Sequence, residues 1–157
     1  MSDPTVIHDT FTLERTYAAS VARVFAFLSE PERKKTWYAA AEGRDVAAFE
    51  MDFRDGGVER LAIRLGQDTP FPGTVVENAS RYEDIVPGRR VVTSGSMTLG
   101  GRRISSHLVT LELVADGETT TLRLTHQAAF YEGADGPEMR KGGWEVLLAS
   151  LGRAIET

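Results

Sequence analysis

The sequence contains no cysteine among its 157 residues. Disulfide bonds and thiolate metal sites are therefore excluded, and nothing in the composition indicates an oxidising compartment. Long apolar runs are also missing, since no stretch approaches the roughly 18 residues that a membrane-spanning helix needs. The first ten residues, MSDPTVIHDT, lack the basic region and the apolar core of a signal peptide. We expect a cytoplasmic protein that does not insert into membranes.

An excess of basic residues is absent as well. The chain has 18 Lys and Arg against 23 Asp and Glu, a formal net charge of −5, and its basic residues are scattered in short groups. Nucleic-acid binding is therefore not expected. The hydrophobic share of 41% is ordinary for a globular protein, and no repeat or linker divides the chain. We expect a single domain over residues 1–157.

The start of the chain is predicted to form a strand and two short helices. Residues 11–17 alternate between apolar and polar types, which is typical of a strand with one buried face. Ser20 suits the N-cap of a helix that ends near Ser29. Pro31 suits the first turn of a second helix, which we expect to end near Trp37.

The remaining chain has the pattern of several antiparallel strands followed by one long helix. Glycine-rich and proline-rich turns separate expected strands at 47–53, 58–65, 74–76, 82–86, 90–97, 102–114 and 119–130. The helix is expected to start near Pro137, and its apolar stripe consists of Trp144, Leu147, Leu148, Leu151 and Ile155. A curved sheet is the natural partner for that stripe. We predict an α+β helix-grip fold, in which a curved antiparallel β-sheet wraps around the C-terminal α-helix.

Five segments carry a family resemblance. They are RTYAASVARVFAFLSEPERKKTWY, DFRDGGVERLAIR, YEDIVPGRRVVTSGSM, TLRLTHQAAF and GGWEVLLASL. In order and spacing they resemble the START-like, or SRPBCC, superfamily, in the branch grouped with the C-terminal domain of the Hsp90 ATPase activator. The resemblance covers nearly the whole chain and implies the helix-grip fold. That fold serves lipid carriers, polyketide cyclases, hormone receptors and co-chaperone domains alike, so the function has to be argued from the site residues.

Strand parity places three ionisable side chains on the apolar face of the sheet, toward the last helix. They are His107 beside Val109, His126 beside Phe130, and Glu59 beside Leu61. Each has a simpler interpretation. A histidine on such a face can be a hydrogen-bonded core residue, and Glu59, close to a strand end, can be a solvated or arginine-paired carboxylate.

We predict that a cavity between the sheet and the last helix binds a small hydrophobic molecule of aromatic, polyketide-like or lipid-like type. His107, His126 and Glu59 are the polar groups expected to orient it. The other candidate lining residues, each of which can also be core packing, are Trp37, Phe53, Leu61, Met97, Val109, Phe130, Trp144, Leu147, Leu148 and Leu151. No cofactor is expected, and no metal either, because ligand spacings such as HExxH are absent.

Two alternatives stay open beside ligand binding. The first is a protein interaction domain like that of the Hsp90 activator. There the domain follows a separate N-terminal domain, for which 157 residues leave no room, so a chaperone partner is not expected. The second is a cyclase-like or aromatase-like enzyme that uses an inward histidine as acid or base, although no catalytic motif supports it and a non-enzyme is favoured. The sequence also leaves a homodimer open.

Two adjacent glycines interrupt the last helix. Gly142 and Gly143 fall about one and a half turns after Pro137, where nothing ends the helix. Each glycine costs roughly 1 kcal/mol relative to alanine in a helix interior. We expect that at least one of them lies close against another element, and that Trp144 is largely buried at the cavity.

Overall fold

A computed structural model describes residues 5–156, so positions 1–4 and 157 of the expected domain lie outside the described residues. The strands are β1 (Ile7–Tyr17), β2 (Asp45–Met51), β3 (Val58–Arg64), β4 (Val75–Val86), β5 (Arg90–Leu99), β6 (Arg102–Asp116) and β7 (Thr119–Phe130). The α-helices are α1 (Val21–Ser29), α2 (Pro31–Lys34) and α3 (Pro137–Glu156). A π-helical turn, Lys35–Ala39, and a short 3-10 turn, Ala41–Gly43, lead from α2 to β2.

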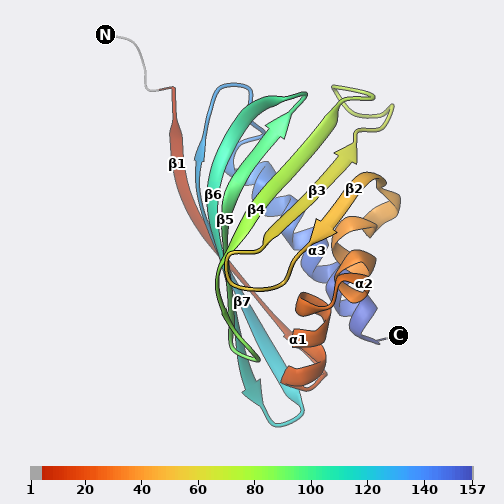
Figure 1. The fold of residues 1–157 in the computed structure, drawn as a ribbon, viewed down its shortest axis with the longest axis vertical. Coiled ribbons are helices and arrows are strands. Elements are labelled where there is room, and N and C mark those ends of the chain that lie inside the picture. The colour runs from red at the N-terminus through yellow and green to blue at the C-terminus, as the bar shows by residue number, and fades with distance from the viewer. Residues whose placement is uncertain (1–4, 157) are drawn as a thin grey trace.

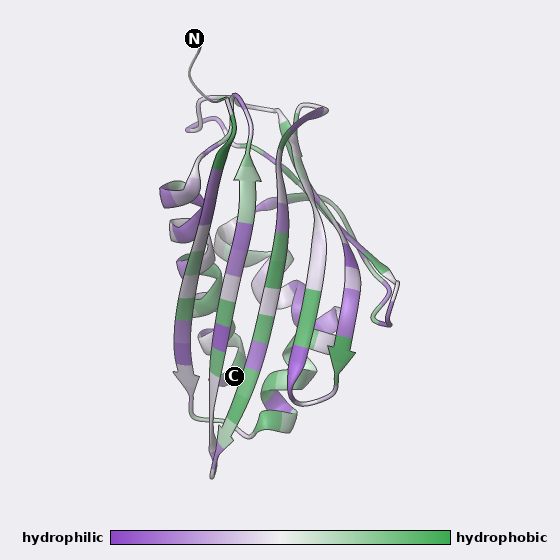
Figure 2. Cartoon of the chain, turned by 90° about the vertical axis from the view of Figure 1, so that its left-hand side faces the viewer, coloured by the Kyte–Doolittle hydropathy of each residue, from purple (hydrophilic) through white to green (hydrophobic). Residues whose placement is uncertain are grey.

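The strands form one antiparallel sheet in the order β1-β7-β6-β5-β4-β3-β2. The sheet is curved, and α3 lies along its concave side with α1 and α2 near its C-terminal end (Figure 1). Apolar and polar bands alternate along the strands, with the helices behind the sheet (Figure 2). The predicted α+β helix-grip fold is therefore confirmed.

The middle of the sheet differs from the expectation in one strand. The segments 74–76 and 82–86 are not two strands but parts of β4, whose central residues are polar. Asn78 lies opposite Leu61 of β3 and Met97 of β5. This polar segment has a low strand propensity, but pairing with β3 on one side and β5 on the other holds it in the sheet.

The second helix also differs. It does not continue as an α-helix to Trp37 but ends at Lys34, and the π-helical turn takes over. Single π-helical turns are frequently found at functional sites. Here the turn buries both Trp37 and Tyr38. The Trp37 indole N–H donates to the Phe27 carbonyl oxygen at 2.8 Å, which anchors the turn on α1.

The apolar stripe of α3 packs on the sheet as predicted. Its buried residues include Leu147, Leu148, Leu151 and Ile155. The Tyr17 hydroxyl donates to the Leu148 carbonyl oxygen at 2.8 Å and ties the helix to β1. Burial of such side chains stabilises the fold by about 1.5–3 kcal/mol each.

The expected close approach at Gly142 and Gly143 is wrong. Apart from the adjacent residues and the neighbouring backbone of α3 itself, a Cβ added to either residue would have no heavy atom of the described residues within 4 Å. The helix comes closest at Gly152 instead, where an added Cβ would lie 3.3 Å from the Tyr17 ring. Trp144 is half-buried rather than largely buried. The C-terminal half of α3 packs against β1, whereas open space lies beside the glycine pair, so Trp144 stays partly exposed.

Thermal unfolding of alanine variants should distinguish the glycine pair, which lies beside open space, from the closely packed Gly152. Gly142→Ala and Gly143→Ala are expected to raise the free energy of unfolding by about 0.5–1 kcal/mol each, because alanine has the higher helix propensity and nothing obstructs its methyl group. Gly152→Ala is expected to lower it by about 1 kcal/mol through crowding of the anchored Tyr17 ring. An increase in melting temperature for all three variants would contradict the close packing at Gly152.

Candidate ligand-binding site

Two hollows meet between the sheet and α3. The inner one is an enclosed cavity of about 30 Å³, and the outer one is a recess of about 190 Å³ beside the first turns of α3. Tyr38, Asn78 and Trp144 line both hollows and are called the partition here. The Tyr38 and Trp144 rings stack with centroids 6.2 Å apart, and the Asn78 amide donates to the Tyr38 hydroxyl at 2.9 Å.

One wall of the inner cavity carries a buried ion pair. Lys34 Nζ lies 2.5 Å from Glu59 Oε1, and the Tyr82 hydroxyl donates to the same carboxylate oxygen at 2.7 Å. The ammonium group also lies 4.7 Å from the centroid of the Tyr38 ring. Both charges are therefore compensated inside the protein, as burial requires. Glu59 is buried and lysine-paired, so its interpretation as a solvated or arginine-paired carboxylate is wrong.

Ser80 and His107 continue this wall across the sheet, because Glu59 pairs with Ser80, and Gly95 pairs with both Ser80 and His107. The Ser80 hydroxyl lies 3.3 Å from His107 Nε2 and donates to Asn78 Oδ1 at 3.3 Å. The direction of the Ser80–His107 hydrogen bond depends on the histidine tautomer. His107 Nδ1 is buried without a hydrogen-bond partner among the described residues.

Two further polar side chains adjoin His107. The His126 ring lies 5.9 Å from it and stacks on Phe11 at 4.7 Å. Arg140 of α3 donates through Nε and Nη2 to Asp135 at 2.8 and 2.7 Å, and through Nη2 to Ser105 at 3.0 Å. Arg140 Nη1 and His126 Nδ1, like His107 Nδ1, are buried without a partner among the described residues. These three atoms are the unpaired polar groups of the site.

Burial sets the protonation states of the site. It lowers the pKa of His107 to about 4 and that of His126 to about 3, and the nearby positive charge of Arg140 acts in the same direction. Burial raises the pKa of the Tyr38 hydroxyl above its ordinary range, and the charge of Glu59 adds to this. At neutral pH both imidazoles and the phenol are therefore uncharged hydrogen-bonding groups rather than ions.

The depressed histidine pKa values predict a loss of stability in mild acid. Unfolded histidine takes up a proton near pH 6.5, but the folded protein does so only near pH 4 or below. Between these values the unfolded state binds more protons, so the free energy of unfolding falls as the pH falls. From about pH 7 to about pH 5 we expect a loss of about 1–2 kcal/mol per buried histidine in urea unfolding.

The chain offers a matched pair of variants for this prediction. His126→Phe, which keeps the stacking on Phe11, is expected to remove about half of the acid effect. His8→Asn changes an exposed histidine on β1 and should leave the effect intact. Equal stability of the wild-type protein at both pH values would show that the imidazoles are not shielded from water.

The structure divides the predicted lining residues into two groups. Those that line a hollow are Glu59, Met97, His107, Val109, Trp144 and Leu147. Those that line neither hollow are Trp37, Phe53, Leu61, His126, Phe130, Leu148 and Leu151. All of the second group are buried or half-buried among other side chains. Contact of any of these residues with a ligand stays a prediction.

Twelve residues that line the hollows were not predicted as site residues from the sequence. They are Lys34, Tyr38, Arg44, Asn78, Ser80, Val91, Thr93, Leu111, Asp135, Met139, Arg140 and Gly143. A signal existed for Arg140, which lies four residues before Trp144 and therefore on the line of the apolar stripe. A signal also existed in β4, where Asn78 and Ser80 share the parity of the buried Tyr82.

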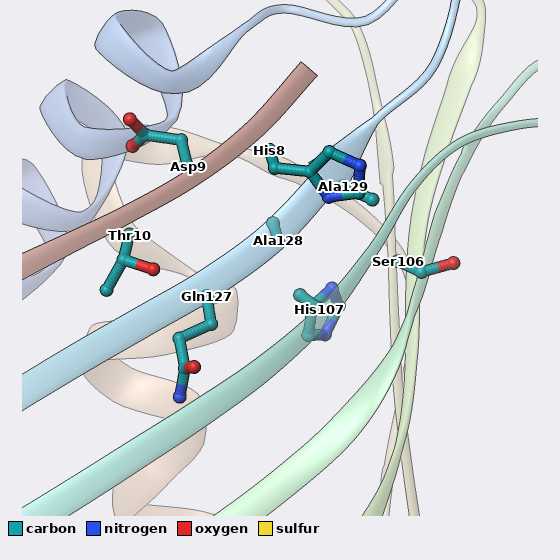
Figure 3. A pocket seen from close by; sticks show the side chains of 8 residues that line it. All are labelled: His8, Asp9, Thr10, Ser106, His107, Gln127, Ala128 and Ala129. Carbon is teal, nitrogen blue, oxygen red and sulfur yellow. The ribbon is translucent and has the colours of Figure 1, made fainter. Parts of the chain in front are cut away.

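Other hollows lie on the outside of the molecule. A shallow depression of about 430 Å³ involves β1, β7 and β6, and Figure 3 shows its residues, among them His8, Thr10 and Gln127. A groove of about 710 Å³ runs between α1, α2 and α3. Both are open to solvent, unlike the enclosed hollows that bind small apolar molecules. Within residues 5–156, no group of three or more His, Asp or Glu could hold a metal ion.

No described helix is both long and apolar enough to cross a membrane.

Solved structures of similar proteins exist. A protein from Rhizobium leguminosarum is 32% identical, with 96% of each chain covered and a TM-score of 0.89. Mll3558 from Rhizobium loti is 36% identical, with 96% of this chain and 99% of that chain covered and a TM-score of 0.84.

A more distant structure is CalU16 from Micromonospora echinospora. It is 24% identical, with 93% of this chain and 75% of that chain covered and a TM-score of 0.62, which shows a shared fold. No curated protein matches the chain. The family profile described as Activator of Hsp90 ATPase homolog 1-like protein matches residues 18–156. The chain therefore belongs to this family of the START-like, or SRPBCC, superfamily.

Proposed function

We propose that the protein binds a small aromatic molecule between the curved sheet and α3, in the space that the partition now divides. The observation that carries this proposal is that Tyr38, Asn78 and Trp144 separate an accessible recess from a cavity whose wall holds buried polar side chains. Such a combination of apolar walls and a few convergent polar groups is typical of small-molecule sites.

The described conformation is the closed one. Pockets for drug-sized ligands measure about 300–1,000 Å³, whereas the recess and the inner cavity measure about 190 and 30 Å³. Displacement of the Trp144 indole would join them and free one face of the Tyr38 ring. An aromatic ligand can then take the place of the indole on Tyr38, since offset stacking suits any aromatic ring.

The helix is built to permit this displacement. Gly142 and Gly143 directly precede Trp144, and open space lies beside both of them. Glycine leaves the backbone more conformational freedom than any other residue. Met139, one turn before Gly143 on the same helix, also lines the recess and is 69% exposed. Arg140 stays anchored on Asp135 and Ser105 when the indole moves, so the displacement involves the backbone from Gly142 to Trp144.

Binding of the uncharged dye Nile red tests the proposal. We expect a saturable increase in fluorescence at a ratio of one dye per chain, competed by naphthalene. Gly143→Phe would fill the recess, which Gly143 lines, and should abolish binding. Gly142→Phe adds the same side chain at a neighbouring position that does not line it, and should retain binding. Equal binding by both variants, or none by the wild-type protein, would refute a site between sheet and helix.

The cyclase-like alternative stays a prediction from the sequence. Burial holds the pKa of His107 at about 4. A general base works best when its pKa lies near the working pH, so this imidazole is a weak base in the closed protein. No feature of the described residues favours catalysis over binding.

A further inference from the structure

β1 forms one edge of the sheet and is regular along its whole length. It pairs with β7 through 11 consecutive residues, Ile7 to Tyr17, without a bulge, and within residues 5–156 no strand lies on its other side. It also contains no proline, which would interrupt a ladder. β2, at the opposite edge, is shorter and carries a bulge between Val46 and Ala48, a device that natural sheets use to prevent edge pairing. β1 is therefore the edge that can accept another strand.

The sequence of β1 is complementary to itself in the antiparallel direction. A two-fold axis perpendicular to the sheet keeps the concave faces of two copies on one side, so it has to pass through a residue of the strand. With the axis at Thr12, the middle of β1, all 11 residues find a partner. Asp9 then lies opposite Arg15 of the second copy, twice by symmetry, and Phe11 lies opposite Leu13. Opposite charges and apolar side chains paired in this way stabilise a sheet.

The neighbouring registers lack this match. With the axis at Phe11, Asp9 would lie opposite Leu13 of the second copy, and with the axis at Leu13, Phe11 would lie opposite Arg15. Charged side chains on an edge strand discourage pairing with unrelated strands. Those of β1 therefore select a second copy of the same strand and fix its register at Thr12.

The two charged side chains are placed to meet a second copy. Asp9 takes part in none of the ion pairs found within residues 5–156. Arg15 Nη1 donates to the Glu14 carbonyl oxygen at 2.7 Å, and Nη2 lies 3.8 Å from the Glu145 carboxylate of α3. These contacts are exposed and hold the guanidinium only weakly. A guanidinium has five N–H donors, so Arg15 can also bind the Asp9 carboxylate of the second copy.

The helix behind this edge carries small residues. α3 lies on the concave side of the sheet (Figure 2), where Gly152 lies against the Tyr17 ring. Ala149, one turn earlier on the neighbouring helix surface, is exposed. Helix axes can approach more closely where the side chains between them are small, so the α3 helices of two copies can pack beside the axis.

We propose that two copies of the chain pair through β1, antiparallel and with Thr12 on the two-fold axis, so that their sheets join into one continuous sheet. The paired strands run together for about 35 Å. This homodimer goes beyond the proposed function and does not depend on it. None of the described residues that line the recess or the inner cavity belongs to β1, so the ligand site stays accessible in the dimer.

Exchange of the two charges tests the register by sedimentation equilibrium. Asp9→Arg brings two arginine side chains face to face, and Arg15→Asp brings two aspartate side chains face to face, each twice in a dimer. Either variant alone is expected to weaken self-association at least tenfold. An equimolar mixture of the two variants should associate as a heterodimer as tightly as the wild-type protein, because every facing pair then carries opposite charges.

The opposite edge of the sheet provides the matched control. Arg64 of β3 pairs with Asp45 of β2, at 3.3 Å between Nη1 and Oδ2. Arg64→Asp therefore makes the same change of charge beside the β2 edge, and it should leave the dissociation constant of the dimer unchanged. Thermal unfolding of each variant verifies that it is folded.

A cross-link locates the axis without any change of charge. Thr12→Cys gives the chain its single thiol. Two such thiols meet on the axis, so oxidised glutathione, which accepts the two electrons and leaves as two thiols, should convert this variant into a disulfide-linked dimer. Thr125→Cys lies beside Thr12 on β7. Its thiols would be three strand spacings apart, about 14 Å, and should not link.

Three results would overturn the proposal. The first is a wild-type protein that stays monomeric at every concentration. The second is a dimer that Asp9→Arg and Arg15→Asp leave intact, or that Arg64→Asp weakens, because the contact would then lie on another surface. The third is equal cross-linking of Thr12→Cys and Thr125→Cys, which would reflect random collision. If a charge variant does not fold, the cross-linking comparison decides alone.

Discussion

Replacing Lys34 by methionine is expected to lower the free energy of unfolding by about 3–5 kcal/mol, the usual cost of breaking a buried ion pair from one side. The variant leaves the Glu59 carboxylate buried with one remaining hydrogen bond, from the Tyr82 hydroxyl. Methionine nearly matches the volume of lysine, so packing changes little. Urea unfolding monitored by tryptophan fluorescence measures the loss.

Two controls make this result specific. Adding Glu59→Gln to Lys34→Met removes the unpaired charge and should restore most of the lost stability, because replacing a whole buried pair is often nearly neutral. Arg60→Met, one residue along β3 on the opposite face, breaks a half-exposed pair with Glu77 and should change stability little. A Lys34→Met variant as stable as the wild-type protein would mean that water reaches the pair.

The faces of the strands were predictable from the sequence because the side-chain period of a strand is two. His107 and His126 alternate in register with apolar residues, and a slip of one residue would turn every apolar side chain outward. Both lie on the buried face as predicted. The same argument placed Glu59 inside, although its partner was not foreseen.

The partner of Glu59 could not be recognised because Lys34 belongs to a basic run, Arg33-Lys34-Lys35, which is typical of a solvated helix surface. The π-helical turn that follows Lys34 changes the direction of the chain, and Tyr38 is buried with it. A sequence pattern based on 3.6 residues per turn does not describe such a turn. Only the fold shows that this segment faces the polar wall of the cavity.

The single strand β4 was predicted as two strands because its central residues are polar. Asn78 and Ser80 lie in a polar segment that resembles a loop, so the sequence does not indicate that they share a strand face with Tyr82.

The prediction of close packing at the glycine pair is wrong for a different reason. A glycine inside a helix indicates either close packing or freedom of the backbone, and propensity alone does not distinguish them. The open space beside Gly142 and Gly143 decides for backbone freedom.

Replacing Trp144 by alanine is expected to increase the affinity for Nile red about tenfold. In the closed protein the indole occupies the aromatic face of Tyr38 and separates the two hollows. A ligand that binds only the open form loses affinity in proportion to the small population of that form. Removing the indole makes the open form permanent, so this cost disappears even though one aromatic contact is lost.

The comparison with two further variants decides whether Trp144 closes the site or holds the ligand. Val146→Ala, an exposed position on the same helix, should leave Nile red affinity unchanged. Trp144→Phe keeps a ring beside Tyr38 but a smaller one, so its affinity should lie between those of the wild-type protein and Trp144→Ala. If the higher affinity of Trp144→Ala comes from easier entry of Nile red, the association rate should rise and the dissociation rate should change little. An affinity that falls in the order Trp, Phe, Ala would instead make the indole part of the binding surface, and the closed partition would then be the wall of a preformed site.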